Sequence, residues 1–306
     1  MITIIRKTLN SEVEEIKKIL KGSWIHLYKP TDEEIKRVHK KTRIPLDYLR
    51  AALDEAERPR IEKEKNTTLI ILRTAVKNSI VKTIPLSIII TPNYFVTVSL
   101  EKLDFIEDFF TGKIKNFSTR KRSRLLMQIF VRIIRTFIKH LNKIEDEIEL
   151  TEYHLKKRLN NEDIIRLLKH EKTLVYFNTS LLSNGSVLER ISKGRIIKLY
   201  EEDEDILDDV IIDNKQAAEM TRVFSDILSH TTDAYASLIN NNLNIVMKFL
   251  TAITIILSIP MIISGYYGMN VKLPIQQNPQ AFWIIILISL IIMYLSTLLF
   301  ARKNWL

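Results

Sequence analysis

Two long uncharged apolar runs near the C-terminus constrain the fold of this chain more than any other feature. They extend from Phe249 to Tyr267 and from Ala281 to Ala301, and neither contains an acidic or basic residue. Each is about as long as a helix must be to cross roughly 30 Å of hydrocarbon. A buried helix of a soluble domain is the alternative for one such run, but two runs joined by a short polar loop favour a membrane hairpin. We therefore expect an integral membrane protein.

The basic residues beside the two runs predict their orientation. Lys248 precedes the first run, and Arg302 and Lys303 follow the second. The loop 270–280 between the runs contains Lys272 as its one basic residue. Because Lys and Arg are enriched in loops on the cytosolic side, we expect a multi-pass protein of the cell membrane with both termini in the cytosol and the short loop outside.

The composition argues against several classes of function. The 306 residues include no Cys, which excludes disulfides, thiolate metal sites and cysteine nucleophiles. The 6 His are scattered without the spacing of a zinc enzyme. Neither a phosphate-binding loop nor a catalytic triad is apparent, so we do not expect an enzyme or an organic substrate. The net charge is +10, but the charges are mixed in sign, and such a surface requires no nucleic acid as a partner.

Short strands and helices alternate at the start of the chain and predict an α+β cytosolic domain over residues 1–204. The expected strands are Met1–Arg6, Ser23–Leu27, Thr67–Val76, Ile80–Thr91 and Tyr94–Ser99, with turns at Asn78-Ser79 and Pro92-Asn93. The expected helices are Thr31–Lys40, which begins with a capping box of Thr31 and Glu34, and Pro45–Glu57. Together these elements predict a small antiparallel sheet with helices.

Long helices are expected after Glu101. Apolar residues at helical spacing predict a hairpin of Arg122–Leu159 and Asn161–Lys193, whose basic tip we interpret as a solvated helix end. No Pro or Gly occurs between Asp205 and Pro260, so one helix of on the order of 90 Å can extend to about Tyr267. The acidic run before it suits the positive end of a helix dipole. We expect a stalk at 205–246 and a membrane domain at 247–306, with an outer loop at 268–280.

Heptad steps along this helix gather polar residues on one seam. One row consists of Asp209, Gln216, Val223, His230, Ser237, Asn244, Thr251, Ser258 and Gly265. The companion row consists of Ile212, Glu219, Asp226, Asp233, Asn240, Met247, Thr254, Met261 and Gly268. A coiled-coil seam would be apolar, so a ring of these helices would enclose a polar lumen in which Asp226 and Asp233 attract cations. An ordinary solvent face and close packing of small residues are the alternatives.

The turn Tyr267-Gly268-Met269-Asn270 ends the first of the two spans. In this position, followed by one more span and a short basic tail, it closely resembles the signature of the CorA magnesium-transporter family. The resemblance extends to Asn244–Thr251 and Pro260, and in the N-terminal domain to Ile44-Pro45-Leu46 and Glu57-Arg58-Pro59-Arg60. It covers in effect the whole chain.

The resemblance implies a funnel-shaped homopentamer, in which the first span lines a pore and the second surrounds it. Two spans cannot enclose a conduit, so a channel requires a symmetric oligomer in any case. Tyr267, Gly268, Met269 and Asn270 would form the ion-selecting outer mouth. Mg²⁺ keeps several of its waters, and a ring of amide and carbonyl oxygens accepts hydrogen bonds from those waters. The implied pore-lining residues are Asn244, Met247, Leu250, Thr251, Thr254, Ser258, Met261 and Gly265, of which Met247 and Leu250 match an apolar constriction that closes by dewetting.

The resemblance also implies regulation by Mg²⁺ bound between cytosolic domains, with Mg²⁺ and Co²⁺ as transported ions. Asp209 matches the stalk carboxylate of the family. Its expected partner on an adjacent subunit is Asp54, with Asp47 and Glu57 as alternatives. Loss of the shared ion would let the subunits separate and the pore open.

Three features depart from the family pattern. The outer loop after the signature contains Lys272 and no acid, so capture of cations there would rest on Asn270 and backbone carbonyls. Ser258 and Met261 stand where Met and Thr are expected, and the basic tail is reduced to Arg302-Lys303.

Two other functions remain open. A Zn²⁺, Co²⁺ or Ni²⁺ transporter of the same architecture is one of them, although the intact Met269 favours Mg²⁺. A membrane-anchored scaffold that conducts no ion is the other. A scaffold predicts an apolar seam and no need for the amide at Asn270, which the polar seam argues against.

Overall fold

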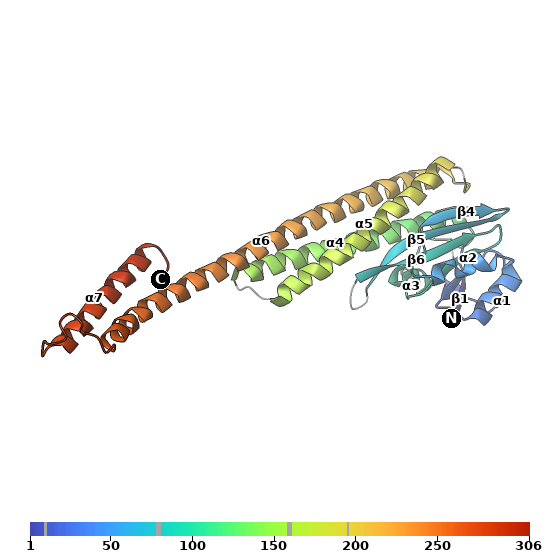
Figure 1. Cartoon of the computed structure of the whole chain (residues 1–306). Coiled ribbons are helices and arrows are strands. Elements are labelled where there is room, and N and C mark those ends of the chain that lie inside the picture. The colour runs from blue at the N-terminus through green and yellow to red at the C-terminus, as the bar shows by residue number, and fades with distance from the viewer. Residues whose placement is uncertain (9–10, 78–80, 158–160, 195) are drawn as a thin grey trace. The chain divides into compact units, whose positions relative to one another are not determined.

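The computed structural model describes residues 1–8, 11–77, 81–157, 161–194 and 196–306 (Figure 1). The chain divides into two compact units, residues 1–230 and 231–306, and helix α6 (Glu201–Tyr267) contributes to both. The predicted turn at Asn78-Ser79 lies outside the described residues, and the side chains at the predicted basic tip near Lys156 are likewise not described.

The first unit is built on a seven-stranded sheet in the order β2-β1-β3-β7-β6-β5-β4. Its strands are β1 (Ile2–Arg6), β2 (Glu14–Glu15), β3 (Trp24–Tyr28), β4 (Arg60–Glu64), β5 (Thr67–Lys77), β6 (Val81–Ile90) and β7 (Phe95–Ser99). The five predicted strands are confirmed, but the sheet is mixed, because β3 and β7 pair in parallel with Trp24 opposite Phe95. Parallel neighbours require a crossover connection, and here residues 29–94 supply it. The unpredicted β2 and β4 are edge strands, largely charged, without apolar alternation.

Two short helices cover one face of the sheet. Helix α1 (Asp32–Thr42) has the predicted capping box, in which Glu34 N donates to Thr31 Oγ1 at 3.3 Å and Thr31 N donates to Glu34 Oε2 at 2.9 Å. Helix α2 (Leu46–Arg50) begins after Pro45 and continues as a 3-10 turn, η1 (Ala51–Leu53). The predicted helix therefore ends four residues before Glu57, because Asp54 takes an extended backbone. Buried side chains of α1 and α2 form a core with β3, β5 and β7.

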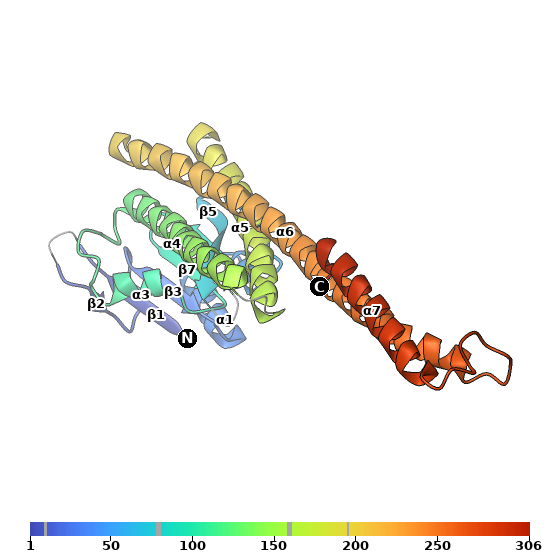
Figure 2. The same cartoon turned by 90° about the vertical axis from the view of Figure 1, so that its left-hand side faces the viewer.

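The opposite face of the sheet carries the predicted helical hairpin, α4 (Arg122–Lys157) and α5 (Asn161–Gly194) (Figures 1 and 2). Its first helix begins at Arg122 as predicted, the second agrees with the prediction to within one residue, and the predicted end at Leu159 lies outside the described residues. Asn184 of α5 is fully buried and exchanges two hydrogen bonds with the backbone of Arg73 in β5, at 2.9 and 2.8 Å. Its amide thus fastens α5 to the sheet.

An aromatic cluster lies at the N-terminal end of β3 and includes helix α3 (Asp104–Phe110), which the sequence did not predict. Trp24 is fully buried, with ring centroids 5.3 Å from Phe109 and 5.0 Å from Phe110. Its indole N–H donates to Thr97 Oγ1 at 2.9 Å, and His26 Nδ1 lies 2.9 Å from the same hydroxyl. Burial lowers the pKa of His26 from 6.5 to about 4, so the imidazole is held neutral.

The second unit contains the end of α6, a loop and helix α7 (Ala281–Arg302). The two helices are the ones in the described chain that are long and apolar enough to cross a membrane, and α7 runs back alongside the end of α6 in both views (Figures 1 and 2). Helix α6 begins at Glu201, four residues earlier than predicted, because the acidic run forms its first turn. It ends at Tyr267, as predicted.

Candidate ion pathway and regulatory carboxylates

The signature turn closes the C-terminal end of α6. Gly268 N donates to Ser264 O at 2.9 Å, and Met269 N donates to Tyr266 O at 3.2 Å. The hydroxyl of Tyr267 donates to Pro274 O at 3.1 Å and so ties the loop to the helix end. Asn270 is exposed, and its side-chain amide has no hydrogen-bond partner among the described residues. That amide is therefore available to water or to a hydrated ion.

Two glycines near this turn have no packing reason within one chain. A Cβ added at Gly265 would meet nothing within 4 Å, and one added at Gly268 would make ordinary contacts of 3.4 and 3.5 Å with backbone oxygens of α6. Gly265 lies within α6, where glycine costs about 1 kcal/mol relative to Ala, whereas Gly268 follows the end of the helix. The packing of the single chain therefore does not require glycine at either position.

The predicted pore-lining residues lie on the exposed side of α6 within the second unit. Asn244, Met247, Leu250, Thr251, Thr254, Met261 and Gly265 are exposed and Ser258 is half-buried, whereas Ala252 and Ile256 are buried. At about 100° per residue, the seam centres on the side of α6 opposite Ala252 and Ile256. The seam therefore lies away from the face of α6 that the chain itself buries. It is exposed to water or to a partner.

The hydroxyls on this seam have a common orientation. Thr251, Thr254 and Ser258 each donate to the carbonyl four residues earlier, at 2.7, 2.8 and 2.7 Å. A hydroxyl whose proton is bound to its own helix presents oxygen lone pairs to its surroundings. The seam thus offers acceptors, which suit cations and the hydrogens of their water shells.

The acidic residues of α6 in the first unit differ in whether they form an ion pair. Glu219 binds Arg222 at 2.6 Å, and this hydrogen bond lowers the pKa of the carboxyl. Asp226 is exposed and helps to raise the pKa of Arg222. In the second unit, Asp233 is also exposed, and the described residues include no ion-pair partner for it.

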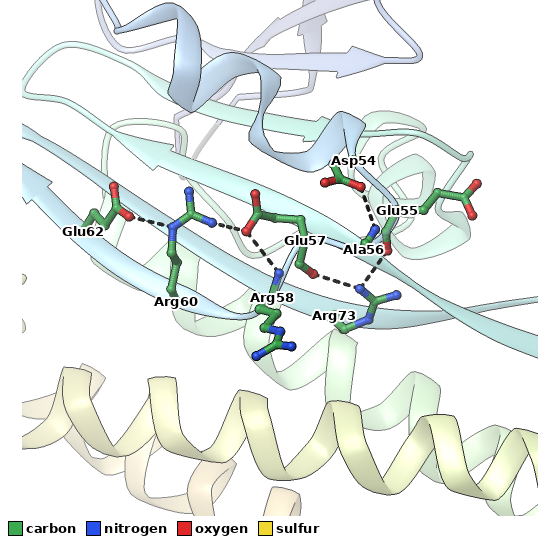
Figure 3. A network of polar contacts seen from close by, with 8 residues as sticks. All are labelled: Asp54, Glu55, Ala56, Glu57, Arg58, Arg60, Glu62 and Arg73. Atoms are coloured by element: carbon green, nitrogen blue, oxygen red, sulfur yellow. Dashed lines mark hydrogen bonds and ion pairs between the residues drawn. The ribbon is translucent and has the colours of Figure 1, made fainter.

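Three of the four candidate regulatory carboxylates, Asp209, Asp47 and Asp54, are exposed on the first unit, and Glu57 is half-buried. Asp209 is exposed on α6, and Asp47 is exposed on α2. Asp54 follows η1, and its Oδ1 accepts a hydrogen bond from Ala56 N at 2.9 Å (Figure 3). Within the described part of a single chain, no three His, Asp or Glu side chains gather as a metal site. Among the described residues, neither Asp54 nor Asp209 is part of such a group.

Glu57 is already engaged by basic groups (Figure 3). Its carboxylate pairs with the Arg60 guanidinium and accepts from Arg58 N at 3.1 Å. Arg73, which the sequence analysis missed, donates to the carbonyls of Glu55 and Glu57 at 3.0 and 2.9 Å. Burial lowers the pKa of Arg73, which Glu55 partly opposes. The Glu57–Arg60 segment thus serves to hold the loop after η1 on the sheet.

Comparison with known proteins agrees with this architecture. Residues 21–302 match the family model described as CorA-like Mg²⁺ transporter protein. The chain belongs to the CorA family. It is 32% identical over 292 residues to the cobalt/magnesium transport protein CorA of Methanocaldococcus jannaschii, a match that covers 92% of this chain and 90% of that protein. It is 27% identical over 266 residues to the cobalt/magnesium transport protein CorA of Thermotoga maritima, covering 83% and 74%.

The fold is also that of CorA. The complete structure of the CorA magnesium transporter from M. jannaschii matches this chain with a TM-score of 0.88 and 30% identity, covering 100% of this chain and 99% of the other. CorA proteins are membrane transporters of Mg²⁺ and Co²⁺ rather than enzymes, and the two apolar helices fit that placement. The family predicted from the signature turn is therefore confirmed, along with the α+β domain, helical hairpin and long helix.

Proposed function

We propose that this chain forms a homopentamer in the cell membrane and conducts Mg²⁺, and also Co²⁺, into the cell along the membrane potential. The observation that carries the proposal is the acceptor-rich seam of α6, which lies opposite its buried face and leads to the signature turn. In a symmetric ring, five copies of this seam enclose one polar path. The names of the CorA relatives, which are cobalt/magnesium transport proteins, support the choice of ions.

Selection of the ion is assigned to the turn of Gly268, Met269 and Asn270 at the outer mouth, beside Tyr267. Mg²⁺ dehydrates reluctantly, so five Asn270 amide oxygens bind its waters rather than the bare ion. The free side chain of Asn270 supports this role. No acid follows in the loop 271–280, and the mouth therefore selects through hydrogen-bond acceptors.

Further in, the proposed path narrows at Met247 and Leu250, whose exposed apolar side chains would close it by dewetting. Asn244 forms the next polar ring, and Asp226 and Asp233 raise the local concentration of cations. The basic residues Lys248, Arg302 and Lys303, which flank the two spans, support the proposal that both termini lie in the cytosol.

Closure is assigned to cytosolic Mg²⁺ shared by Asp209 of one copy and Asp54 of the next. The absence of a three-ligand cluster from the described part of one chain fits a site divided between copies. Glu57 is the weakest of the three partner carboxylates considered, because Arg60 already compensates its charge. Asp47, which is exposed, is the second candidate.

Mg²⁺ flux into proteoliposomes tests the proposed conduction and the role of Asn270. The Mg²⁺ flux of the Asn270→Ala variant is expected to be about tenfold or more below that of wild type, because each pentamer loses five amide acceptors at its mouth. Gln277→Ala, which removes another exposed amide from the same loop, is the matched control and should leave the flux unchanged. Equal flux in wild type and Asn270→Ala would refute the role of Asn270, and flux no greater than in empty liposomes would identify a scaffold. Competition by Co²⁺ and Zn²⁺ ranks the ions.

A further inference from the structure

A cavity of about 1010 Å³ in the first unit lies apart from the proposed ion path and the regulatory carboxylates. Four segments surround it: the β4–β5 hairpin, the turn between β6 and β7, residues 120–124 at the start of α4, and residues 196–203 before and within α6. Its volume is at the upper end of the roughly 300–1,000 Å³ of small-molecule sites.

The cavity has a strong excess of positive charge. Five of its lining residues are cations without an acidic partner among the described residues: Lys63, Arg120, Lys121, Arg122 and Lys198. Arg124 is different, because it pairs with Glu202 at 2.5 Å and with the buried Asp203 at 2.6 Å. Glu201 is then the one lining carboxylate left to offset five cations. Like charges gathered around one cavity attract an anion to it.

Two of these cations are held in place without being neutralised. Lys63 Nζ donates to Ile196 O at 2.9 Å, and an Arg122 guanidinium N–H donates to Pro92 O at 2.6 Å. Both acceptors are backbone carbonyls that line the cavity. The two side chains therefore keep a fixed orientation and their full charge.

Two largely buried residues in the cavity wall also carry hydroxyls without a hydrogen-bond partner among the described residues. Thr68 is 7% exposed and Ser123 is 8% exposed, and neither hydroxyl forms a hydrogen bond within the described part of the chain. A hydroxyl can donate to an oxygen acceptor, so a ligand with phosphate oxygens could bind both. Ser123 lies in the first turn of α4, where backbone N–H groups have no acceptor within the helix and the helix dipole is positive. Leu125 N is bonded to Lys121 O at 2.9 Å, so the free N–H groups are those before it.

The remaining wall contains the polar residues Asn66 and Thr91 and an apolar part that includes a flat ring. The apolar part consists of Ile90, Pro92, Ile196 and Ile197, together with Tyr200, a residue that is 67% exposed. Inorganic phosphate would leave this surface unused. A planar organic group joined to phosphates would cover it by stacking on the phenol ring.

We propose that this cavity binds a soluble organic polyphosphate of the nucleotide class. The phosphate groups lie among Lys121, Arg122 and Ser123 at the start of α4, and the organic group lies against Tyr200. The ligand thus bridges the start of α4 and the segment that leads into α6. This site is independent of the proposed conduction of Mg²⁺.

Calorimetric titration of the full-length protein in phosphatidylcholine nanodiscs tests this proposal, with ADP as the probe and EDTA present to remove divalent cations. The Lys121→Ala/Lys198→Ala variant should bind ADP about tenfold or more weakly, since it loses two charge-assisted contacts. Lys36→Ala/Lys40→Ala on α1 removes two exposed cations elsewhere and should bind like wild type. Thermal melting without ligand checks that all the proteins are folded.

Three further outcomes would overturn the assignment. They are no binding of ADP at millimolar concentration, equal affinity of both double variants, and binding of ADP no tighter than that of inorganic pyrophosphate. Nanodiscs that contain an anionic phospholipid separate the two sources of phosphate. Unchanged affinity for ADP supports a soluble ligand, whereas loss of ADP binding would assign the cavity to a lipid headgroup.

Discussion

Replacement of Gly185 by Ala tests the packing of α5 against α6. A Cβ at Gly185 would lie 2.9 Å from Asn214 Nδ2, closer than real side chains approach. Asn214 is 2% exposed, its Nδ2 donates to Leu181 O at 2.9 Å, and its Oδ1 has no partner within the described residues. The amide cannot move aside without losing its one hydrogen bond in a buried place.

The expected change in the free energy of unfolding combines two destabilising effects and one stabilising effect. An unsatisfied buried amide costs about 1–3 kcal/mol, and overpacking at the helix contact costs about 1–3 kcal/mol. Alanine gains about 1 kcal/mol of helix propensity over glycine. The Gly185→Ala variant should therefore be destabilised by about 1–5 kcal/mol, although propensity alone predicts a gain.

Thermal melting of the full-length protein, followed by circular dichroism, measures the effect. Ser186→Ala, an exposed neighbour on α5, is the control and should melt like wild type. The double variant Gly185→Ala/Asn214→Ala should recover stability relative to Gly185→Ala, because it removes the amide that the new methyl group meets. A melting temperature of Gly185→Ala at or above that of wild type would refute the packing argument, and so would strictly additive effects in the double variant.

Three other outcomes are expected. Gly265→Ala and Gly268→Ala should melt at or above the wild-type temperature yet conduct less Mg²⁺ into proteoliposomes. Reduced stability with normal flux would contradict the inference that these glycines matter for conduction and not for packing within one chain. His26 is neutral when folded and has a pKa of about 4 against 6.5 when unfolded, so the unfolded chain binds more protons between these values. Stability should be fully present above pH 6.5 and fall by about 3 kcal/mol as the pH is lowered to 4, and denaturant unfolding of His26→Gln should lack this component. Asp209→Ala should weaken closure by internal Mg²⁺ in a flux titration, whereas the neighbouring Asp208→Ala should not; equal inhibition in both would remove Asp209 from the site.

Long elements with one sustained pattern could be predicted from the sequence, whereas features set by distant residues could not. The helical spacing of apolar residues predicted α4 and α5, and the absence of Pro and Gly over a long stretch predicted α6. A local capping box predicted the start of α1. The parallel pairing of β3 with β7 depends on a crossover that no local pattern records. The early end of η1 follows from the backbone of Asp54, which turns away from the helix.

The functional residues divide in the same way. The signature turn and the seam of α6 are contiguous or periodic in the sequence, so both could be proposed as candidates from the sequence, and their roles stay predictions. Arg73 was missed because the carbonyls it binds lie in a loop of a different element. The basic cavity was missed because Lys63, Arg122 and Lys198 belong to three separate segments that only the fold brings together.

The chemistry of the seam on α6 determines how conductance through the proposed channel responds to pH. Between Asn244 and Gly268, the seam contains amide, hydroxyl, thioether and glycine positions, and none of them gains or loses a proton near neutral pH. A filter of carboxylates would lose its cation affinity in acid, but a path lined by bound hydroxyls and amides keeps the same acceptors. For the proposed channel, conductance through the membrane section should therefore be insensitive to pH, and any pH dependence of transport must originate outside it.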